Sequence, residues 1–210
     1  GAAYGSSGVY ALSADDGTEQ WSYEIGANRA ASPAVVGDTV YVGSTYDDHS
    51  VYALSAEDGT EQWSFQTGDS VSSLPTVLDG TVYVGSHDNN VYALSAGDGT
   101  EQWSFQTGDR VQSTPAVAGG VVYVGSHDGN VYALSTEDGT EQWAYDTDDI
   151  VASSPAVVNG TVCVGSNDNN VYALSVEDGT EQWSFGTEGA VQSSPAVVNG
   201  TVYVGNVDEK

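Results

Sequence analysis

Residues 82–103 read VYVGSHDNNVYALSAGDGTEQW, and close copies of this stretch recur along the whole chain. The ending Asp-Gly-Thr-Glu-Gln-Trp carries each of the five tryptophans, which lie 42, 40, 40 and 40 residues apart (Trp21, Trp63, Trp103, Trp143 and Trp183). A proline follows each one after a polar connection (Pro33, Pro75, Pro115, Pro155 and Pro195). A constant period of this length indicates a repeat protein in which neighbouring units share one core.

One copy, residues 114–145, divides into four short apolar runs separated by turn residues. The runs are 115–117, 121–126, 131–134 and 141–145, and they are rich in β-branched and aromatic residues, which favour strands. Gly-Gly and Asp-Gly between them suit tight hairpin turns. Apolar spacing near 3.6 is absent, which excludes a helical solenoid, and a parallel β-helix is the weaker β alternative. The pattern predicts an all-β propeller with about five four-stranded antiparallel blades of roughly 40 residues.

The two ends of the chain complement one another in this pattern. Aligned on Trp21, the N-terminus holds a third strand (9–12) and a fourth strand (19–23), and the C-terminus holds a first (195–198) and a second (201–205). We expect residues 1–210 to form one domain, with a closed five-blade ring favoured because closure removes exposed strand edges. The expected units are 1–24 completed by 193–206, 32–66, 74–106, 114–146 and 154–186. A fragment of a larger ring, or strand exchange between chains, is the alternative.

The charge of the chain excludes two classes of partner. Thirty acidic and three basic residues give a net charge of −27, which repels nucleic acid and anionic lipid. No stretch approaches the roughly 18 apolar residues of a membrane span. The carboxylates are spread through every repeat, which favours a salt-loving, haloarchaeal source, since the Debye length falls to about 3 Å at 1 M salt. An acidic binding surface in ordinary salt is the other interpretation.

The single cysteine, Cys163, occupies the position of a tyrosine in the other repeats (Tyr41, Tyr83, Tyr123 and Tyr203). We therefore expect a buried substitution without chemistry, and an intramolecular disulfide is excluded. The chain has no methionine, even at position 1, so Gly1 is expected to mark a trimmed or processed form or a piece of a longer protein.

The strings at 82–86, 91–95 and 98–103, with their counterparts, resemble the pyrroloquinoline-quinone (PQQ) enzyme-type repeat of the quinoprotein alcohol dehydrogenase-like propellers. The resemblance covers nearly the whole chain and implies that the five tryptophans pack between blades. The family includes dehydrogenases, a lipoprotein of outer-membrane barrel assembly and non-enzymatic surface or sensor proteins. Its dehydrogenases hold PQQ and Ca²⁺ or a lanthanide over the central funnel, against a disulfide of adjacent cysteines that this chain cannot form.

Candidate binding residues come from the resemblance to propellers, in which the turn between the second and third strands shares a face with the connection between blades. The residues expected on that face are Arg29, Asp47, Asp48, His49, His87, Asp88, Arg110, His127, Asp128 and Asp168. The simpler interpretation is that they are solvated turn residues. The three histidines belong to different repeats, so a metal site is not predicted, and neither is a catalytic residue.

Near-identical repeats leave few positions for an asymmetric active site. We therefore expect a non-enzymatic scaffold that binds a protein or a small ligand, without a cofactor. The alternatives are a quinoprotein-like ligand-binding or sensor domain, with PQQ and Ca²⁺ as the less favoured cofactors, and a structural cell-surface module. A monomer is favoured over a strand-exchanged oligomer, and an extracellular or cell-surface location over the cytoplasm.

Overall fold

The computed structural model describes residues 7–26, 29–45 and 48–207, and every regular element in this part of the chain is a β-strand. The strands are β1 (Ser7–Leu12), β2 (Glu19–Ile25), β3 (Arg29–Ala30), β4 (Ala34–Val36), β5 (Thr39–Thr45), β6 (Ser50–Ser55), β7 (Glu61–Gln66), β8 (Thr76–Leu78), β9 (Thr81–Gly85), β10 (Asn90–Ser95), β11 (Glu101–Gln106), β12 (Ala116–Ala118), β13 (Val121–Gly125), β14 (Asn130–Ser135), β15 (Glu141–Asp146), β16 (Ala156–Val158), β17 (Thr161–Gly165), β18 (Asn170–Ser175), β19 (Glu181–Gly186), β20 (Ala196–Val198) and β21 (Thr201–Tyr203). No helix in the described segments is long and apolar enough to cross a membrane.

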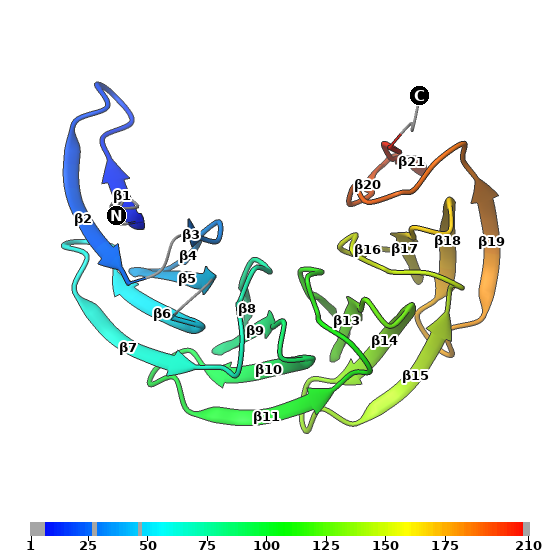
Figure 1. Ribbon diagram of the computed structural model, residues 1–210, viewed down its shortest axis with the longest axis horizontal. Coiled ribbons are helices and arrows are strands. Elements are labelled where there is room, and N and C mark those ends of the chain that lie inside the picture. Colours follow the sequence, from blue (N-terminus) through cyan, green and yellow to red (C-terminus); the bar gives the residue numbers. More distant parts are fainter. Residues whose placement is uncertain (1–6, 27–28, 46–47, 208–210) are drawn as a thin grey trace, which may run out of the picture.

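The strands form four complete antiparallel blades, which confirms the predicted fold class (Figure 1). The blades are β4–β7, β8–β11, β12–β15 and β16–β19, and β3 pairs additionally with β5. β13 covers all but the last residue of the predicted run 121–126, and 131–134 lies within β14. Strand boundaries follow the turn residues because these supply local hydrogen bonds. Thr100, for example, donates from both its backbone N–H and its hydroxyl to Asp98 Oδ1, at 3.1 and 2.8 Å.

The middle strands of each blade are buried on both faces, whereas the fourth strand faces solvent. All of β9 is buried, and so is the centre of β10, while β11 buries only Trp103 among its six residues. This difference follows from the layered packing of a propeller, in which each sheet lies between two others. One core cluster joins Val51 and Trp63 of one blade to Val82 and Leu94 of the next.

Each blade junction is closed by a tryptophan lying on a glycine corner of the following blade. A Cβ atom added to Gly139 would lie 2.6 Å from Cε3 of Trp103, and Gly139 has a positive φ of 72°. The indole Nε1 of Trp103 also donates a hydrogen bond to the carbonyl of Thr136, at 3.0 Å. The same pairing recurs at the other described junctions (Trp21–Gly59, Trp63–Gly99 and Trp143–Gly179). Only glycine permits both this backbone conformation and this close approach.

The favoured closed ring is not what the structure shows. The half-blades β1–β2 and β20–β21 are separate two-stranded sheets at the two ends of an open arc (Figure 1). Each end carries two strands of a blade, but the rotation between neighbouring blades depends on side-chain packing at each junction. The strand pattern does not encode that rotation, and these junctions leave β1 and β21 apart.

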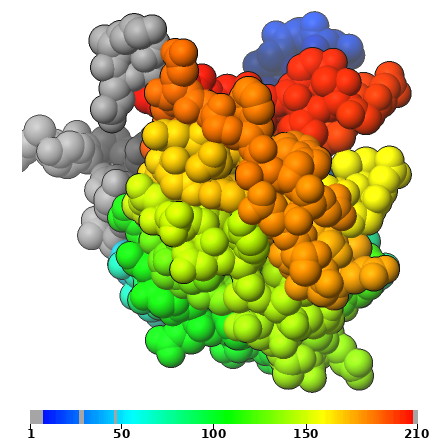
Figure 2. Space-filling view, turned by 90° about the vertical axis from the view of Figure 1, so that its right-hand side faces the viewer, coloured from blue at the N-terminus to red at the C-terminus, as the bar shows by residue number. Residues whose placement is uncertain are grey.

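At the C-terminal end of the arc, apolar side chains are exposed whose equivalents in the inner blades are buried or half-buried. Figure 2 shows the outer face of these last segments. Trp183 is 42% exposed, whereas the other four tryptophans are 7 or 8% exposed. Phe185 and Tyr203 are 65% and 59% exposed. Among the described residues, no glycine corner lies on Trp183, which accounts for the difference.

Candidate functional site

The turns between second and third strands meet the connections between blades at one face, which we call the loop face. Each turn is fixed by its backbone to the connection before it. His87 N–H donates to the carbonyl of Ser70 at 2.8 Å, His127 N–H to that of Arg110 at 3.0 Å, and Asn167 N–H to that of Ile150 at 2.9 Å. The repeated bond places one side chain from a turn beside one from a connection in successive blades.

The turn aspartates expected as binding residues are occupied in holding this framework. Asp128 Oδ2 accepts hydrogen bonds from the Gly108 N–H at 2.6 Å and the Tyr132 hydroxyl at 2.7 Å, and its Oδ1 accepts from the Asn130 N–H at 2.9 Å. Burial raises the pKa of Asp128, but these hydrogen bonds outweigh it, so the pKa lies below its usual value. A carboxylate with so many donors is a structural clamp between two blades.

Asp88 forms the same clamp, and Asp168 repeats the part of it that lies within one blade. Asp88 accepts from Gly68 N–H and from the Tyr92 hydroxyl, both at 2.7 Å. Asp168 accepts from the Tyr172 hydroxyl at 2.5 Å. Burial raises the pKa of Tyr92, and its hydrogen bond to the Asp88 carboxylate raises it further.

His127 joins Arg110 and Gln112 into one polar group. Arg110 Nε lies 3.0 Å from His127 Nδ1, and Gln112 Oε1 lies 3.3 Å from His127 Nε2. Arginine is only a donor, so Nδ1 is the acceptor and the proton of a neutral ring belongs on Nε2, where it faces Gln112. Burial lowers the pKa of His127, and the positive charge of Arg110 lowers it further, which favours this neutral form.

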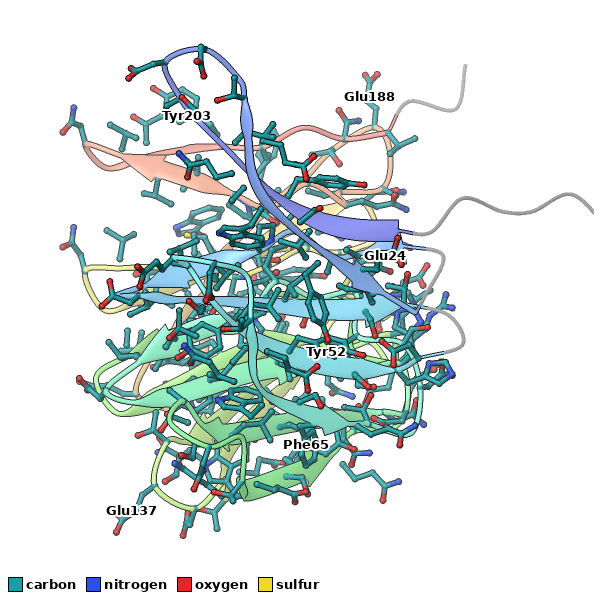
Figure 3. All side chains as sticks on the ribbon, turned by 90° about the vertical axis from the view of Figure 1, so that its left-hand side faces the viewer. Glu24, Tyr52, Phe65, Glu137, Glu188 and Tyr203 are labelled. Atoms are coloured by element: carbon teal, nitrogen blue, oxygen red, sulfur yellow. The ribbon has the colours of Figure 1, made fainter. Side chains whose placement is uncertain are left out.

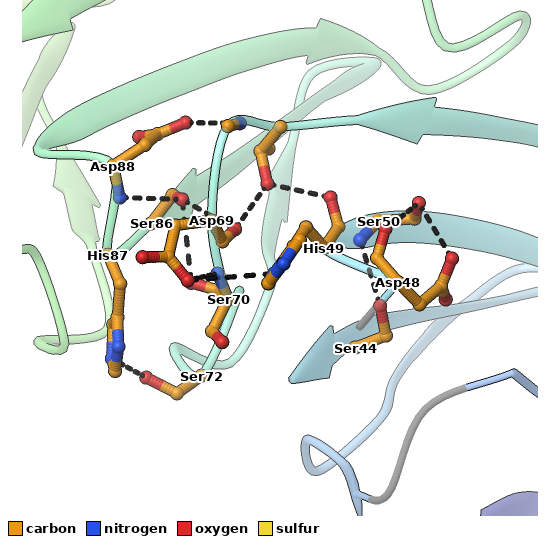
Figure 4. A network of polar contacts seen from close by, with 12 residues as sticks. Ser44, Asp48, His49, Ser50, Asp69, Ser70, Ser72, Ser86, His87 and Asp88 are labelled. Carbon is orange, nitrogen blue, oxygen red and sulfur yellow. Dashed lines mark hydrogen bonds and ion pairs between the residues drawn. The ribbon is translucent and has the colours of Figure 1, made fainter. Parts of the chain in front are cut away.

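His87 occupies the equivalent place one blade earlier, but with a different partner. Its Nε2 lies 2.7 Å from the hydroxyl of Ser72, as Figure 4 shows. Burial lowers the pKa of His87, and Arg110 adds to this effect, while Asp69 and Asp88 oppose it. His87 and His127 are therefore both favoured as neutral rings near pH 7.

The longer turn of the first complete blade is arranged differently. His49, with a positive φ of 54°, places Nδ1 3.6 Å from Asp69 Oδ1, which is too long for a hydrogen bond (Figure 4). Asp48 accepts from the Tyr52 hydroxyl at 2.7 Å. Of the other expected residues, Asp47 lies outside the described residues. Arg29 is placed by its backbone, which pairs with Thr45 in β3–β5.

A cavity of about 660 Å³ opens on the loop face between these blades. Its wall includes His49, His87 and Arg110, which the sequence suggested, and it also includes residues that sequence reasoning did not select (Asp69, Ser70, Ser72 and Gln112). A usable signal was present, because the connections vary between otherwise similar repeats. Counted from the last four tryptophans, the position seven residues later is Ser70, Arg110, Ile150 or Ala190, and the position nine residues later is Ser72, Gln112, Ala152 or Gln192.

The donor set of this face does not fit the PQQ and Ca²⁺ site of a quinoprotein dehydrogenase. In residues 7–26, 29–45 and 48–207, no group of three or more His, Cys, Asp or Glu side chains is placed to hold a metal ion. The turn carboxylates, such as that of Asp128, accept hydrogen bonds from backbone N–H groups and tyrosine hydroxyls. The one cysteine, Cys163, is buried in β17 and has no neighbour for a disulfide.

Comparison with protein families identifies the repeat. The family model described as outer membrane protein assembly factor BamB, a PQQ-repeat model, matches residues 5–113 and 107–210. The chain belongs to this PQQ-repeat family. No curated protein matches the chain.

Three solved structures share the fold with this chain at low sequence identity. The computationally designed Ika8 protein superposes with a TM-score of 0.81 at 15% identity, over 90% of this chain and 59% of that one. BamB from Moraxella catarrhalis superposes with a TM-score of 0.64 at 16% identity, over 90% of this chain and 84% of BamB. The quinohemoprotein alcohol dehydrogenase ADHIIG from Pseudomonas putida HK5 superposes with a TM-score of 0.68 at 19% identity, over 88% of this chain and 40% of the dehydrogenase. The chain thus spans only part of the Ika8 protein and of the dehydrogenase, and identities this low show the fold alone.

Proposed function

We propose that this PQQ-repeat chain is a non-enzymatic propeller scaffold whose loop face binds a protein or small-molecule partner. The observation that carries the proposal is the position of the differences between blades. The fourth strands repeat Glu-Gln-Trp in every copy, whereas the connections that line the cavity change from blade to blade. Chemical variety on a constant framework is what a specific binding surface requires, because fold and function are separable in such scaffolds.

We propose further that the chain needs no quinone cofactor. PQQ-repeat proteins include both the dehydrogenase and the BamB structures named above. Support for the non-enzymatic side comes from the absence of an adjacent cysteine pair in the sequence and from the commitment of the turn aspartates to blade contacts. With PQQ and Ca²⁺ added, we expect neither a shift of the quinone absorbance nor alcohol-dependent dye reduction. Turnover that follows added PQQ would refute this part of the proposal.

The favoured location is outside the cytoplasm, as the description of the family model as an outer membrane protein assembly factor suggests. The favoured partner is neither nucleic acid nor anionic lipid, because the chain carries a charge of −27. We favour a monomer over an oligomer formed by strand exchange. Sedimentation in high salt tests this, and a concentration-dependent dimer would contradict it.

The binding proposal is tested by comparing two variants as cross-linking baits in extracts of the source cells. Gln112→Ala with Ser72→Ala alters the cavity wall, and Glu137→Gln alters the opposite end of the molecule, where Glu137 projects away from Glu24 and Glu188 (Figure 3). A partner captured by the wild type and by Glu137→Gln, but lost with the cavity variant, supports the proposal. Equal capture by all three proteins contradicts it.

A further inference from the structure

Arg110 is a cation that has no carboxylate partner among the described residues of a strongly acidic chain. The one ion pair within 4.0 Å in the described residues joins His49 to Asp69, so no described carboxylate lies that close to Arg110. Within the described segments, the Arg110 side chain forms one hydrogen bond, from its Nε to His127 Nδ1. The terminal Nη atoms, with four N–H donors, have no acceptor among the described residues and border the cavity.

The neighbours of Arg110 hold it in one orientation and add a donor. Because His127 Nδ1 accepts from Arg110 Nε, its Nε2–H is directed at Gln112 Oε1. This contact fixes the Gln112 amide, whose NH₂ group is then left for a further acceptor. A guanidinium and an amide NH₂ on either side of one imidazole form a wall suited to a planar carboxylate.

A negative group lines the same cavity. Asp69 Oδ1 accepts from the Ser70 N–H at 2.6 Å, and this bond holds the pKa of Asp69 below its usual value, with the nearby His49 ring contributing. Both charges act on His87, because Arg110 lowers the pKa of its ring and Asp69 raises it. The cavity is therefore positive at Arg110 and negative at Asp69.

We propose that this cavity binds a zwitterion, an amino acid or a whole short peptide, with its carboxylate on Arg110 and its ammonium group at Asp69. The proposal rests on the loop face being a binding surface. A volume of about 660 Å³ lies within the range of small-ligand sites. A ligand of zero net charge also escapes the repulsion that a chain of −27 exerts on a simple anion.

The three histidines make the test direct, because each ring gives its own NMR signals, which can be assigned with His→Gln variants. The probes are glycine, β-alanine, 4-aminobutyrate and 6-aminohexanoate, whose charges are separated by increasing lengths. Sodium acetate and methylammonium chloride carry one charge each. We expect saturable shifts of the His87 and His127 signals, with one chain length binding at least about tenfold more tightly than either singly charged probe, since each charged hydrogen bond contributes about that much.

Variants separate the site from general charge effects. Arg110→Ser introduces the residue that the preceding repeat has at Ser70, and Asp69→Asn removes the negative end; each is expected to weaken binding about tenfold or more. Lys210→Ser removes one positive charge, as Arg110→Ser does, and Glu137→Gln removes one negative charge, as Asp69→Asn does. Both of these controls should leave binding unchanged. Absence of saturable shifts, equal binding of acetate, or equal binding by Arg110→Ser would overturn the proposal. Loss of cross-linked capture by the cavity variant, with no amino-acid binding, would overturn this inference while leaving the proposed function in place.

Discussion

The indole of Trp103 donates a hydrogen bond to the carbonyl of Thr136 in the next blade and packs against Gly139, which belongs to the same blade as Thr136. Thr136 and Gly139 flank one turn, so a single side chain both bonds and packs against the corner that closes the junction. Hydrogen bonding and steric fit thus act at one place, and a substitution there should weaken the contact between two blades.

The first prediction concerns that corner. Gly139→Ala would place a methyl group 2.6 Å from Trp103 Cε3 at a φ of 72°. Gly120→Ala is the matched control, because Gly120 lies in the same blade with a φ of 80°, and a Cβ atom added there would lie 3.9 Å from its nearest neighbour, Thr136 Oγ1. We expect Gly120→Ala to lower the free energy of unfolding by about 1–2 kcal/mol, from backbone conformation alone.

Gly139→Ala should lower the free energy of unfolding by a further 1–3 kcal/mol or so, from overpacking against the indole. Chemical denaturation in high salt measures both variants. Equal destabilisation would show that the indole moves aside at no cost, and the junction would then be looser than the packing indicates.

The second prediction concerns acid stability. Because the pKa of Asp128 is lower in the folded state, its ionised form stabilises the fold above the ordinary carboxyl pKa of about 4, and this contribution is lost as pH falls through the folded value. Asp128→Asn should therefore lower the free energy of unfolding at pH 7 by about 1–2 kcal/mol. The difference from wild type should shrink below pH 4. Glu137→Gln, an exposed change of the same charge, should give no such difference.

How far the sequence predicts this molecule depends on the range of the interactions. The strands β12–β15 follow from turn residues such as Asp138-Gly139-Thr140, whose hydrogen bonds are formed within a few residues. The loop face was also anticipated, because it requires only the strand order. The open arc was not, because the angle between blades depends on packing across junctions.

The chemistry of the face was predictable only in part, for the same reason. The sequence shows His127 and Arg110 17 residues apart, but not that Arg110 Nε bonds to Nδ1. The role of Asp128 as a clamp likewise depends on Gly108, 20 residues earlier and in the preceding connection. Contacts between segments of different blades lie outside what local patterns encode.

The third prediction concerns salt. With a charge of −27 and a single ion pair within 4.0 Å in the described residues, added salt screens much repulsion and little attraction. The melting temperature should rise steadily from dilute buffer to about 1 M KCl, where the Debye length is about 3 Å. Sucrose at matched water activity controls for general exclusion effects. A melting temperature as high in dilute buffer as in KCl would contradict adaptation to high salt.

The fourth prediction concerns the thiol. Cys163 is 2% exposed in β17, and burial raises the pKa of its thiol, so the reactive thiolate is scarce in the folded protein. A thiol reagent at pH 8 should modify Cys163 only as fast as the C-terminal blade opens. The same reagent should react at once in denaturant. Rapid modification of the folded protein would show that the blade β16–β19 opens readily.

Four of the tryptophans each lie on one junction, and the fifth, Trp183, is exposed at an uncovered end. The chain therefore carries a separate fluorophore for every described contact between blades. Opening of the arc from its C-terminal end would release Trp143 before Trp103, and substitution of phenylalanine at one tryptophan at a time would reveal the order. The same residues that join the blades thus make their separation visible, junction by junction, without any added label.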